Sequence, residues 1–161
     1  MSRTRPNVML TMLGAVLCLT PLAGCSAAAV DDAEPPIGTV ARTKTITAMN
    51  MAAVTNGKGA AIVVGTLVND GHVRDRLIDA HVTAESGPVT ATLPGGPVTL
   101  DPDKPVKLAA RKAILLTADH LREGLIIKLT LDFARSRDVH VGIPVEPQSG
   151  PYADIEVPHR R

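Results

Sequence analysis

Apolar and polar residues alternate with a period of two along several short segments of the chain. The clearest segment is 125–133, where Leu, Ile, Leu, Leu and Phe occupy every second position and mostly polar residues fill the places between them. The segment 139–145 repeats this period, with His140 between apolar neighbours. Successive side chains of a strand point to opposite faces, so each segment predicts a β-strand with one buried and one exposed face.

A continuous apolar run, 60–68, is rich in Val and Ile and is closed by the turn-forming residues Asn69-Asp70-Gly71. This order predicts a strand followed by a β-hairpin. Pro144 cannot donate a backbone hydrogen bond, so it predicts that 139–145 lies at a sheet edge or ends there.

The segment 76–84 also alternates, and this predicts another strand with two unlike faces. Its polar face is expected to carry Asp79 and His81. Its apolar face is expected to carry Ile78, Ala80 and Val82.

Prolines and glycines interrupt any long element between residues 87 and 105, and residues 116–122 could form one helical turn at most. Several short strands separated by closely spaced turn signals predict an all-β protein, an antiparallel Greek-key β-sandwich. From Glu146 onward the residues show no core-facing pattern and predict a Pro-rich tail, 147–161.

The N-terminus has the pattern of a secretory signal. Arg3 and Arg5 precede an uncharged apolar run of twelve residues, 8–19, which is too short to span a bilayer. Leu22-Ala23-Gly24-Cys25 resembles a bacterial lipobox, which predicts cleavage between Gly24 and Cys25 and acylation of Cys25. The alternative is an ordinary secreted protein with a chance cysteine.

These boundaries predict a signal peptide (1–24), a lipidated tether (25–38), a β-sandwich domain (39–146) and the C-terminal tail. Several acyl chains on Cys25 would hold the mature protein on a membrane far more firmly than one chain. Cys18 would leave with the signal peptide and Cys25 would carry lipid, so no disulfide is expected in the folded domain.

Charge and aromatic content exclude several partner classes. Cleavage after Gly24 would leave 15 basic and 16 acidic residues, a formal charge of −1, so no polyanionic partner is indicated. Phe133 and Tyr152 are the only aromatic residues of Phe, Trp and Tyr type, so the stacking platforms of single-stranded nucleic-acid binders are missing. A sugar-binding groove is disfavoured for the same reason.

Four motifs, in this order and spacing, resemble the PCu(A)C copper-chaperone family over about residues 60–146. They are Asn69-Asp70-Gly71, Asp75-Arg76-Leu77, Leu121-Arg122-Glu123-Gly124 and Leu-Thr-Leu-Asp-Phe at 129–133. The resemblance implies a cupredoxin-like β-sandwich, in agreement with the strand pattern. With its N-terminus, the chain resembles a group of actinobacterial envelope lipoproteins.

The copper ligands of that family do not carry over. The resemblance implies one His at about Thr92 and a His-x-Met at about Ala113–Leu115, and none of these residues is a His or Met. Cu(I) prefers thioether and imidazole ligands. The family's copper site is therefore expected to be degenerate, and no cofactor is predicted.

Relocated metal ligands are the alternative. Met49 and Met51 would share one face of an extended segment, although Met is more often a core residue. His81 and His140 lie on the polar faces of their strands and could bind a divalent metal if those strands are neighbours. The remaining histidines of the mature chain are His72, His120 and His159.

No catalytic motif is present, and the chain is expected not to be an enzyme. Asp119-His120 with Glu123 forms the one local acid–base cluster of the sequence, in a short polar turn where solvation alone explains it. Arg76 is expected to pair with Asp75 or Asp79.

The sequence thus predicts a lipid-anchored protein on the extracytoplasmic face of the membrane, with a non-catalytic binding domain. Membrane lipid would be held through the acyl chains of Cys25, and an envelope protein of unknown identity would be the partner. The alternative is an extracytoplasmic copper chaperone that uses the relocated Met and His ligands.

Overall fold

β-Strands form most of the regular structure in residues 39–109 and 112–158, the part of the chain that the computed structural model describes. These residues contain no α-helix, and a 3-10 turn spans Gly150–Tyr152. The strands are β1 (Val40–Arg42), β2 (Ile46–Thr55), β3 (Ala60–Asn69), β4 (Asp75–Thr83), β5 (Thr90–Thr92), β6 (Val98–Leu100), β7 (Val106–Leu108), β8 (Ile114–Thr117), β9 (Ile126–Phe133) and β10 (Val139–Pro147).

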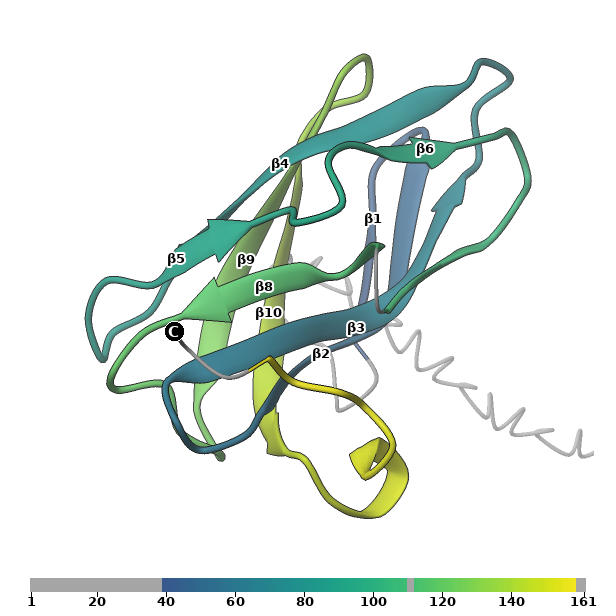
Figure 1. Ribbon diagram of the computed structural model, residues 1–161. Coiled ribbons are helices and arrows are strands. Elements are labelled where there is room, and N and C mark those ends of the chain that lie inside the picture. The colour runs from purple at the N-terminus through teal and green to yellow at the C-terminus, as the bar shows by residue number, and fades with distance from the viewer. Residues whose placement is uncertain (1–38, 110–111, 159–161) are drawn as a thin grey trace, which may run out of the picture. The chain divides into compact units, whose positions relative to one another are not determined.

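The strands are hydrogen-bonded in the order β5-β8-β3-β2-β10-β9-β4-β6, with β1 added to β2 and β7 added to β3. We call β1, β2, β3, β5, β7 and β8 the β3 half, and β4, β6 and β9 the β9 half. The sheet curls so that the two halves face each other (Figure 1). β10 pairs antiparallel with β9 and parallel with β2. The predicted all-β sandwich is confirmed, but it is not wholly antiparallel.

The main hydrophobic core lies between the halves and is built by the alternating strands. In β9 and β10 the apolar residues at every second position are buried, as the sequence predicts, from Ile127 to Phe133 and from Val139 to Val145. Each such side chain stabilises the fold by ~1.5–3 kcal/mol. The largest fully buried side chains are Ile46, Met51, Leu67, Leu77, Leu100, Leu108, Ile114, Leu116, Ile127, Leu129, Leu131 and Ile143.

β10 does not end at Pro144, because it continues to Pro147, and each part of the strand is paired on one side only: residues 139–144 with β9 and residues 145–147 with β2. Pro144 is the last β10 residue opposite β9, where it faces Ile126, and the next residue, Val145, is opposite Ala53 of β2. The proline therefore stands where β10 changes partner, a position at which a missing N–H is least costly.

The hairpin predicted after 60–68 is wrong, since β3 and β4 lie in different halves. The buried amide of Asn69 instead holds the connection folded. Its Nδ2 donates to the carbonyl oxygens of Val73 (2.8 Å) and Leu100 (3.1 Å), and its Oδ1 accepts from the N–H of Gly71 (3.0 Å). A turn residue signals a change of direction, and here the chain turns towards the opposite half.

Asp75 anchors the start of β4 to the loop between β9 and β10. Its carboxylate is buried and accepts hydrogen bonds from the backbone N–H groups of Arg76 (2.7 Å), Arg135 (3.0 Å) and Ser136 (2.9 Å). Burial raises the pKa of Asp75, but hydrogen bonds from the Ser136 side chain and from these backbone groups outweigh it and hold the pKa below its ordinary value.

The ion pair expected for Arg76 is not formed. Within the described residues the arginine that pairs with a carboxylate is Arg74, whose Nε lies 2.6 Å from Oδ1 of Asp101. Asp75 is engaged with backbone groups and Asp79 faces a histidine. Position in sequence alone cannot tell which of two nearby arginines reaches an acid.

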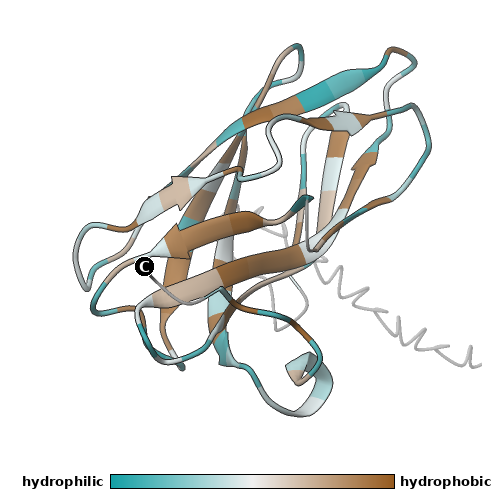
Figure 2. Cartoon of the chain, viewed as in Figure 1, coloured by the Kyte–Doolittle hydropathy of each residue, from teal (hydrophilic) through white to brown (hydrophobic). Residues whose placement is uncertain are grey.

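A second hydrophobic cluster covers the outer face of the β3 half. Ile62 and Val64 of β3 are buried there under Val157, with Tyr152 and Ile155 packed alongside. β3 is therefore apolar along most of its length, as Figure 2 shows. The C-terminal residues 152–157 are thus part of the packed structure, although their sequence shows no core-facing period. They approach as a turn and an extended segment, and neither follows a helical or strand alternation.

Candidate functional site

The structure brings together the two positions at which the copper ligands of the PCu(A)C family are expected. Thr92 of β5 lies directly opposite Leu115 of β8. Directly opposed residues of an antiparallel pair have Cβ atoms ~4.5–5.5 Å apart on the same face. The two side chains at this place are thus a hydroxyl and an aliphatic group, and neither is the soft donor that Cu(I) prefers.

Ala113, the third of these positions, is buried in the second hydrophobic cluster, which Leu115 also contacts. β8 pairs with β3 along its other edge, where Leu115 lies opposite Ile62. These positions therefore serve packing against the outer face of the β3 half.

Met49 and Met51 do not share a face, so the prediction of a common thioether pair is wrong. Asn50 has a left-handed backbone with φ of 53°, and the pairing of β2 with β3 shifts register between Met49 and Ala52. Such a bulge adds a residue and reverses the alternation. Met51 is 1% exposed in the main core, whereas Met49, opposite Thr66, is only partly buried on the outer face.

Met51 packs against Gly65 of β3, whose lack of a side chain leaves room for the thioether. Its Sδ occupies the place that a Cβ at Gly65 would need, and Gly65 has φ of 151°. The thioether is thus enclosed between strands and acts as core packing.

His81 and His140 lie on the same exposed face but not on neighbouring strands. β9 separates β4 from β10, and each histidine is directly opposite Thr130 of β9. Two strand spacings of ~4.8 Å therefore separate their backbones. His140 Nδ1 lies 3.0 Å from Oγ1 of Thr130, so each imidazole has its own partner.

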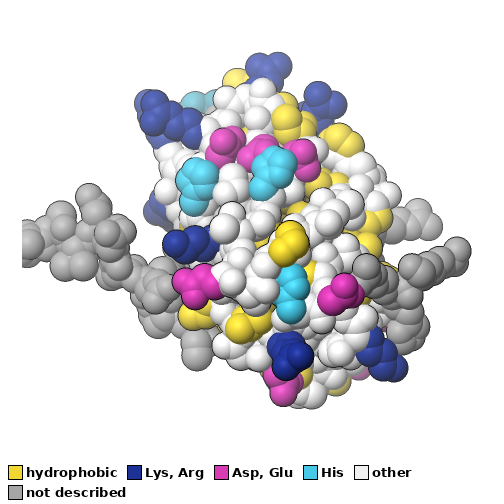
Figure 3. All heavy atoms as spheres, turned by 90° about the vertical axis from the view of Figure 1, so that its left-hand side faces the viewer, with side chains coloured by type: hydrophobic (Ala, Val, Ile, Leu, Met, Phe, Trp, Pro, Cys, Tyr) yellow, Lys and Arg dark blue, Asp and Glu magenta, His cyan; other side chains and the backbone are white. Residues whose placement is uncertain are grey.

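His81 meets two carboxylates on that face. Its Nε2 lies 2.9 Å from Oδ2 of Asp132 on β9 and 3.8 Å from Oδ2 of Asp79 on β4. The possible ligand atoms of the three residues all lie within 4.8 Å of one another. Figure 3 shows histidine and acidic side chains gathered on one face of the molecule. We call Asp79, His81 and Asp132 the β4–β9 cluster.

A β-bulge at Ile78 brings Asp79 into this cluster. The pairing of β4 with β9 runs Leu77 opposite Phe133 and then Asp79 opposite Asp132, so one residue of β4 is extra. Leu77 and Ala80 are consequently buried while Ile78 is 45% exposed. The prediction that Ile78 faces the core is wrong for this reason, whereas the predicted exposure of Asp79 and His81 is confirmed.

Sequence patterning anticipated His81 as a metal ligand candidate but not its partners. Asp132 was expected only as a polar position of its strand. The order β4-β9-β10 depends on pairing between segments about 50 residues apart in the chain, and no local pattern encodes it.

His120, from the acid–base cluster noted in the sequence, lies in the loop between β8 and β9. Its ring packs against Gly87, where an added Cβ would come within 2.9 Å of Cε1. Nε2 of His120 is buried and has no hydrogen-bond partner among the described residues. The imidazole here fills the space beside a glycine in the β4–β5 loop.

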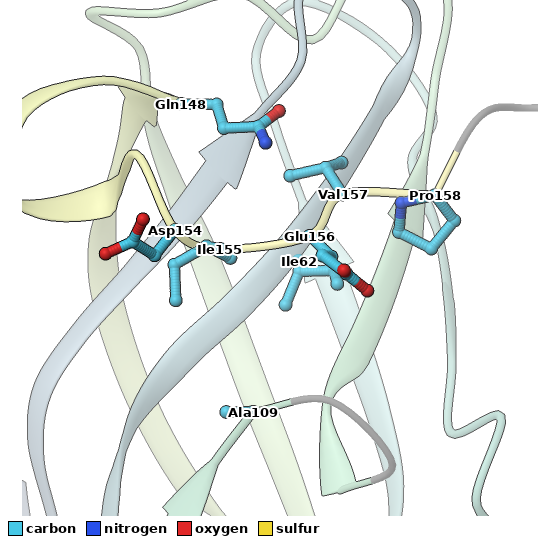
Figure 4. Close-up of a pocket in the computed structure, with 8 residues that line it drawn as sticks. All are labelled: Ile62, Ala109, Gln148, Asp154, Ile155, Glu156, Val157 and Pro158. Atoms are coloured by element: carbon cyan, nitrogen blue, oxygen red, sulfur yellow. The ribbon is translucent and has the colours of Figure 1, made fainter.

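A groove of about 860 Å³ runs between the C-terminal segment and the outer face of the β3 half (Figure 4). Apolar side chains of Ile62, Ile155 and Val157 line it together with the carboxylates of Asp154 and Glu156. It contains none of the histidines or methionines considered above.

Gly24 and Cys25, the predicted cleavage and lipidation residues, lie outside the described residues, as does His159. In the described part of the chain, no helix has the length and apolar character needed to cross a membrane.

Comparison with solved structures identifies the fold. The chain is similar to the apo PCuAC domain from PmoF1, with a TM-score of 0.52 and 21% identity over 68% of this chain and 99% of that one. It is similar to the copper-bound PCuAC domain from PmoF2, with a TM-score of 0.54 and 20% identity over 68% of this chain and 98% of that one. No protein-family model and no curated protein matches the sequence.

The apo PCuAC domain of PmoF2 gives a TM-score of 0.52 at 18% identity, over 70% of this chain and 98% of that one. The described domain therefore has a PCuAC-like, cupredoxin-like β fold, as the strand pattern and the motifs predict. At this level of identity the likeness concerns the fold.

Proposed function

We propose that this chain is a lipid-anchored protein of the extracytoplasmic membrane face, whose PCuAC-like domain binds a partner without catalysis and without copper at the family's position. The observation that carries the proposal is the opposition of Thr92 and Leu115. A fold that places two residues together, but fills both places with non-ligating side chains, keeps the scaffold and not the chemistry.

Because Thr92 and Leu115 provide no soft donor, we expect a low affinity for Cu(I) at this position. Cu(I) prefers thioether and imidazole ligands. The facing pair of β5 and β8 offers only one hydroxyl and one aliphatic side chain. We therefore expect no tight Cu(I) binding by the purified protein in which Cys18 and Cys25, whose free thiolates would bind Cu(I) themselves, are replaced by serine. Competition against a chromophoric Cu(I) chelator measures this, and retention of Cu(I) at sub-micromolar free concentration would contradict the proposal.

Membrane anchoring rests on the lipobox-like residues Leu22 to Cys25 and is tested separately. The Cys25→Ser variant is expected in the soluble fraction, and the unchanged chain in the membrane fraction. Retention of the variant on the membrane would refute lipid anchoring through this residue. The partner would be an envelope protein, and crosslinking in intact cells followed by mass spectrometry would identify it.

The second candidate function is an extracytoplasmic copper chaperone with relocated ligands. It is supported by the likeness to a copper-bound PCuAC domain and by the partly exposed Met49. Met51 lies on the opposite face of β2, so such a site would need donors other than this pair. The same competition assay distinguishes the candidates, because only the chaperone would hold Cu(I) against the chelator.

A further inference from the structure

We infer that the β4–β9 cluster, Asp79, His81 and Asp132, is a binding site for a divalent cation of the Zn²⁺ class. This site is independent of the proposed function. It lies in the β9 half, whereas the positions expected for copper, Thr92 and Leu115, pair within the β3 half.

Ligand spacing fits a small tetrahedral ion. Ligands bound to Zn²⁺ at ~2.0–2.1 Å in a tetrahedral arrangement lie ~3.3 Å from one another. His81 Nε2 is 2.9 Å from one carboxylate oxygen and 3.8 Å from the other, values that lie on either side of this separation. The ligand atoms of all three residues, the two carboxylates included, lie within 4.8 Å of one another.

Donor type selects the ion. One imidazole nitrogen and two carboxylate oxygens suit borderline divalent ions such as Zn²⁺, and three protein ligands leave a fourth position for water. A soft monovalent ion such as Cu(I) is not favoured because the cluster has no sulfur donor. Cu²⁺ would compete at the same three residues, since it stands highest in the affinity order of divalent ions.

The two carboxylates of the β4–β9 cluster carry like charges at neighbouring positions of the sheet. Asp79 and Asp132 are directly opposite each other, and like charges in directly opposed positions destabilise a sheet. Within the described residues the ion-pair partner of both carboxylates is the same side chain, His81. A divalent cation would neutralise both carboxylates at once.

The backbone aims the first of these carboxylates outward. Without the bulge at Ile78, strict alternation from the buried Leu77 would turn Asp79 towards the core. β-Bulges re-aim side chains and are frequent beside functional sites. Oδ1 of Asp79 also accepts a hydrogen bond of 2.8 Å from the N–H of Ala80, which fixes the carboxylate and leaves Oδ2 towards His81.

The test is a Zn²⁺ titration of the full chain in competition with a chromophoric chelator. Cys18 and Cys25 are replaced by serine in every protein, because free thiolates bind Zn²⁺ themselves. We expect one equivalent to bind at micromolar or lower concentration. Asp79→Asn, His81→Gln and Asp132→Asn should each weaken binding at least tenfold.

His140→Gln is the matched control, since it removes an exposed imidazole on the same face that is opposite the same residue, Thr130. It should change the affinity by less than twofold. NMR of the imidazole nitrogens should show a Zn²⁺-dependent shift of His81 Nε2. Absence of binding, or binding that survives His81→Gln or is lost in His140→Gln, would overturn the inference. The thermal transition of each metal-free variant reports whether it is folded.

Discussion

The carboxylate of Asp75 accepts a hydrogen bond of 2.9 Å from the backbone N–H of Ser136, a residue 61 positions later in the chain. This contact joins the first residue of β4 to the loop between β9 and β10. It shows that the Asp75-Arg76-Leu77 motif has a structural role at its first residue.

Replacing Asp75 with asparagine should therefore destabilise the fold. The amide can keep one acceptor, but it loses the charge and turns an N–H₂ group towards backbone donors. Hydrogen bonds to charged groups contribute ~1.5–3 kcal/mol, so we expect the free energy of unfolding to fall by about 2–3 kcal/mol. Urea denaturation measures this. Asp138→Asn, at an exposed position of the same loop, should change it by less than ~0.5 kcal/mol.

The lowered pKa of Asp75 also makes stability depend on acid. A carboxyl group whose pKa is lower in the folded than in the unfolded state stabilises the protein above its unfolded pKa and loses this effect as the pH falls through the folded pKa. The contribution of Asp75 should thus be complete above pH about 4 and decline below the ordinary value of 3.8. The difference in unfolding free energy between the wild type and Asp75→Asn should shrink over this acidic range. A difference that is constant from pH 6 to pH 2.5 would contradict the assignment.

Gly65→Ala should destabilise the β3 half. An added Cβ would collide with Sδ of Met51 and would lie 3.1 Å from the carbonyl oxygen of Met49, which is backbone and cannot move aside. Overpacking of this kind costs ~1–3 kcal/mol. Gly142→Ala is the control, because a Cβ there meets only Cγ2 of Ile126 at 3.7 Å. Thermal unfolding should show a lower midpoint for the first variant and no comparable loss for the second.

Val157→Asp tests whether the C-terminal segment belongs to the packed structure. Val157 is 8% exposed against the second hydrophobic cluster, and a carboxylate there would have to leave or be buried. We expect the free energy of unfolding to fall by at least ~1–3 kcal/mol and an apolar dye to bind Ile62 and Val64 once they are uncovered. The same substitution at Val73, which is 60% exposed, should have little effect on either measurement.

Restoring soft ligands should create copper affinity. The double variant Thr92→His/Leu115→Met places an imidazole and a thioether at directly opposed positions of β5 and β8. With Cys18 and Cys25 replaced by serine in every protein, we expect it to retain Cu(I) at least tenfold better than the chain that keeps Thr92 and Leu115, as measured by chelator competition. Thr99→His/Lys107→Met, at exposed positions of β6 and β7, is the control and should gain nothing. Equal Cu(I) retention by all three proteins would show that Thr92 and Leu115 do not occupy a latent copper position.

Strands whose alternation is unbroken could be predicted from sequence, face by face. In β9 and β10 each buried residue was predicted to be buried, because in a regular strand every second side chain points to the core and the apolar residues occupy those positions. β2 and β4 could not be predicted in this way. Bulges at Asn50 and Ile78 each add one residue, so counting by two across a bulge no longer predicts the face of a residue. This counting places Met51 on the wrong face, and it gives the exposure of Asp79 correctly only by chance. Asn50 carries a partial signal, since asparagine tolerates φ above zero better than most residues.

The β4–β9 cluster could be predicted only in part for a different reason. His81 and Asp79 are two residues apart on one strand, but Asp132 reaches them through pairing between distant segments. Such pairing depends on which strand fills the place between β4 and β10. Local sequence records the face of a side chain and not the neighbour across the sheet.

Among the described strands, β10 is the one that pairs with both halves of the sandwich, and it is also the last of them in sequence. No N-terminal portion that ends before residue 139 contains β10, the strand through which the sheet is continuous from one half to the other. The continuous sheet of both halves can therefore form only after β10 has been synthesised.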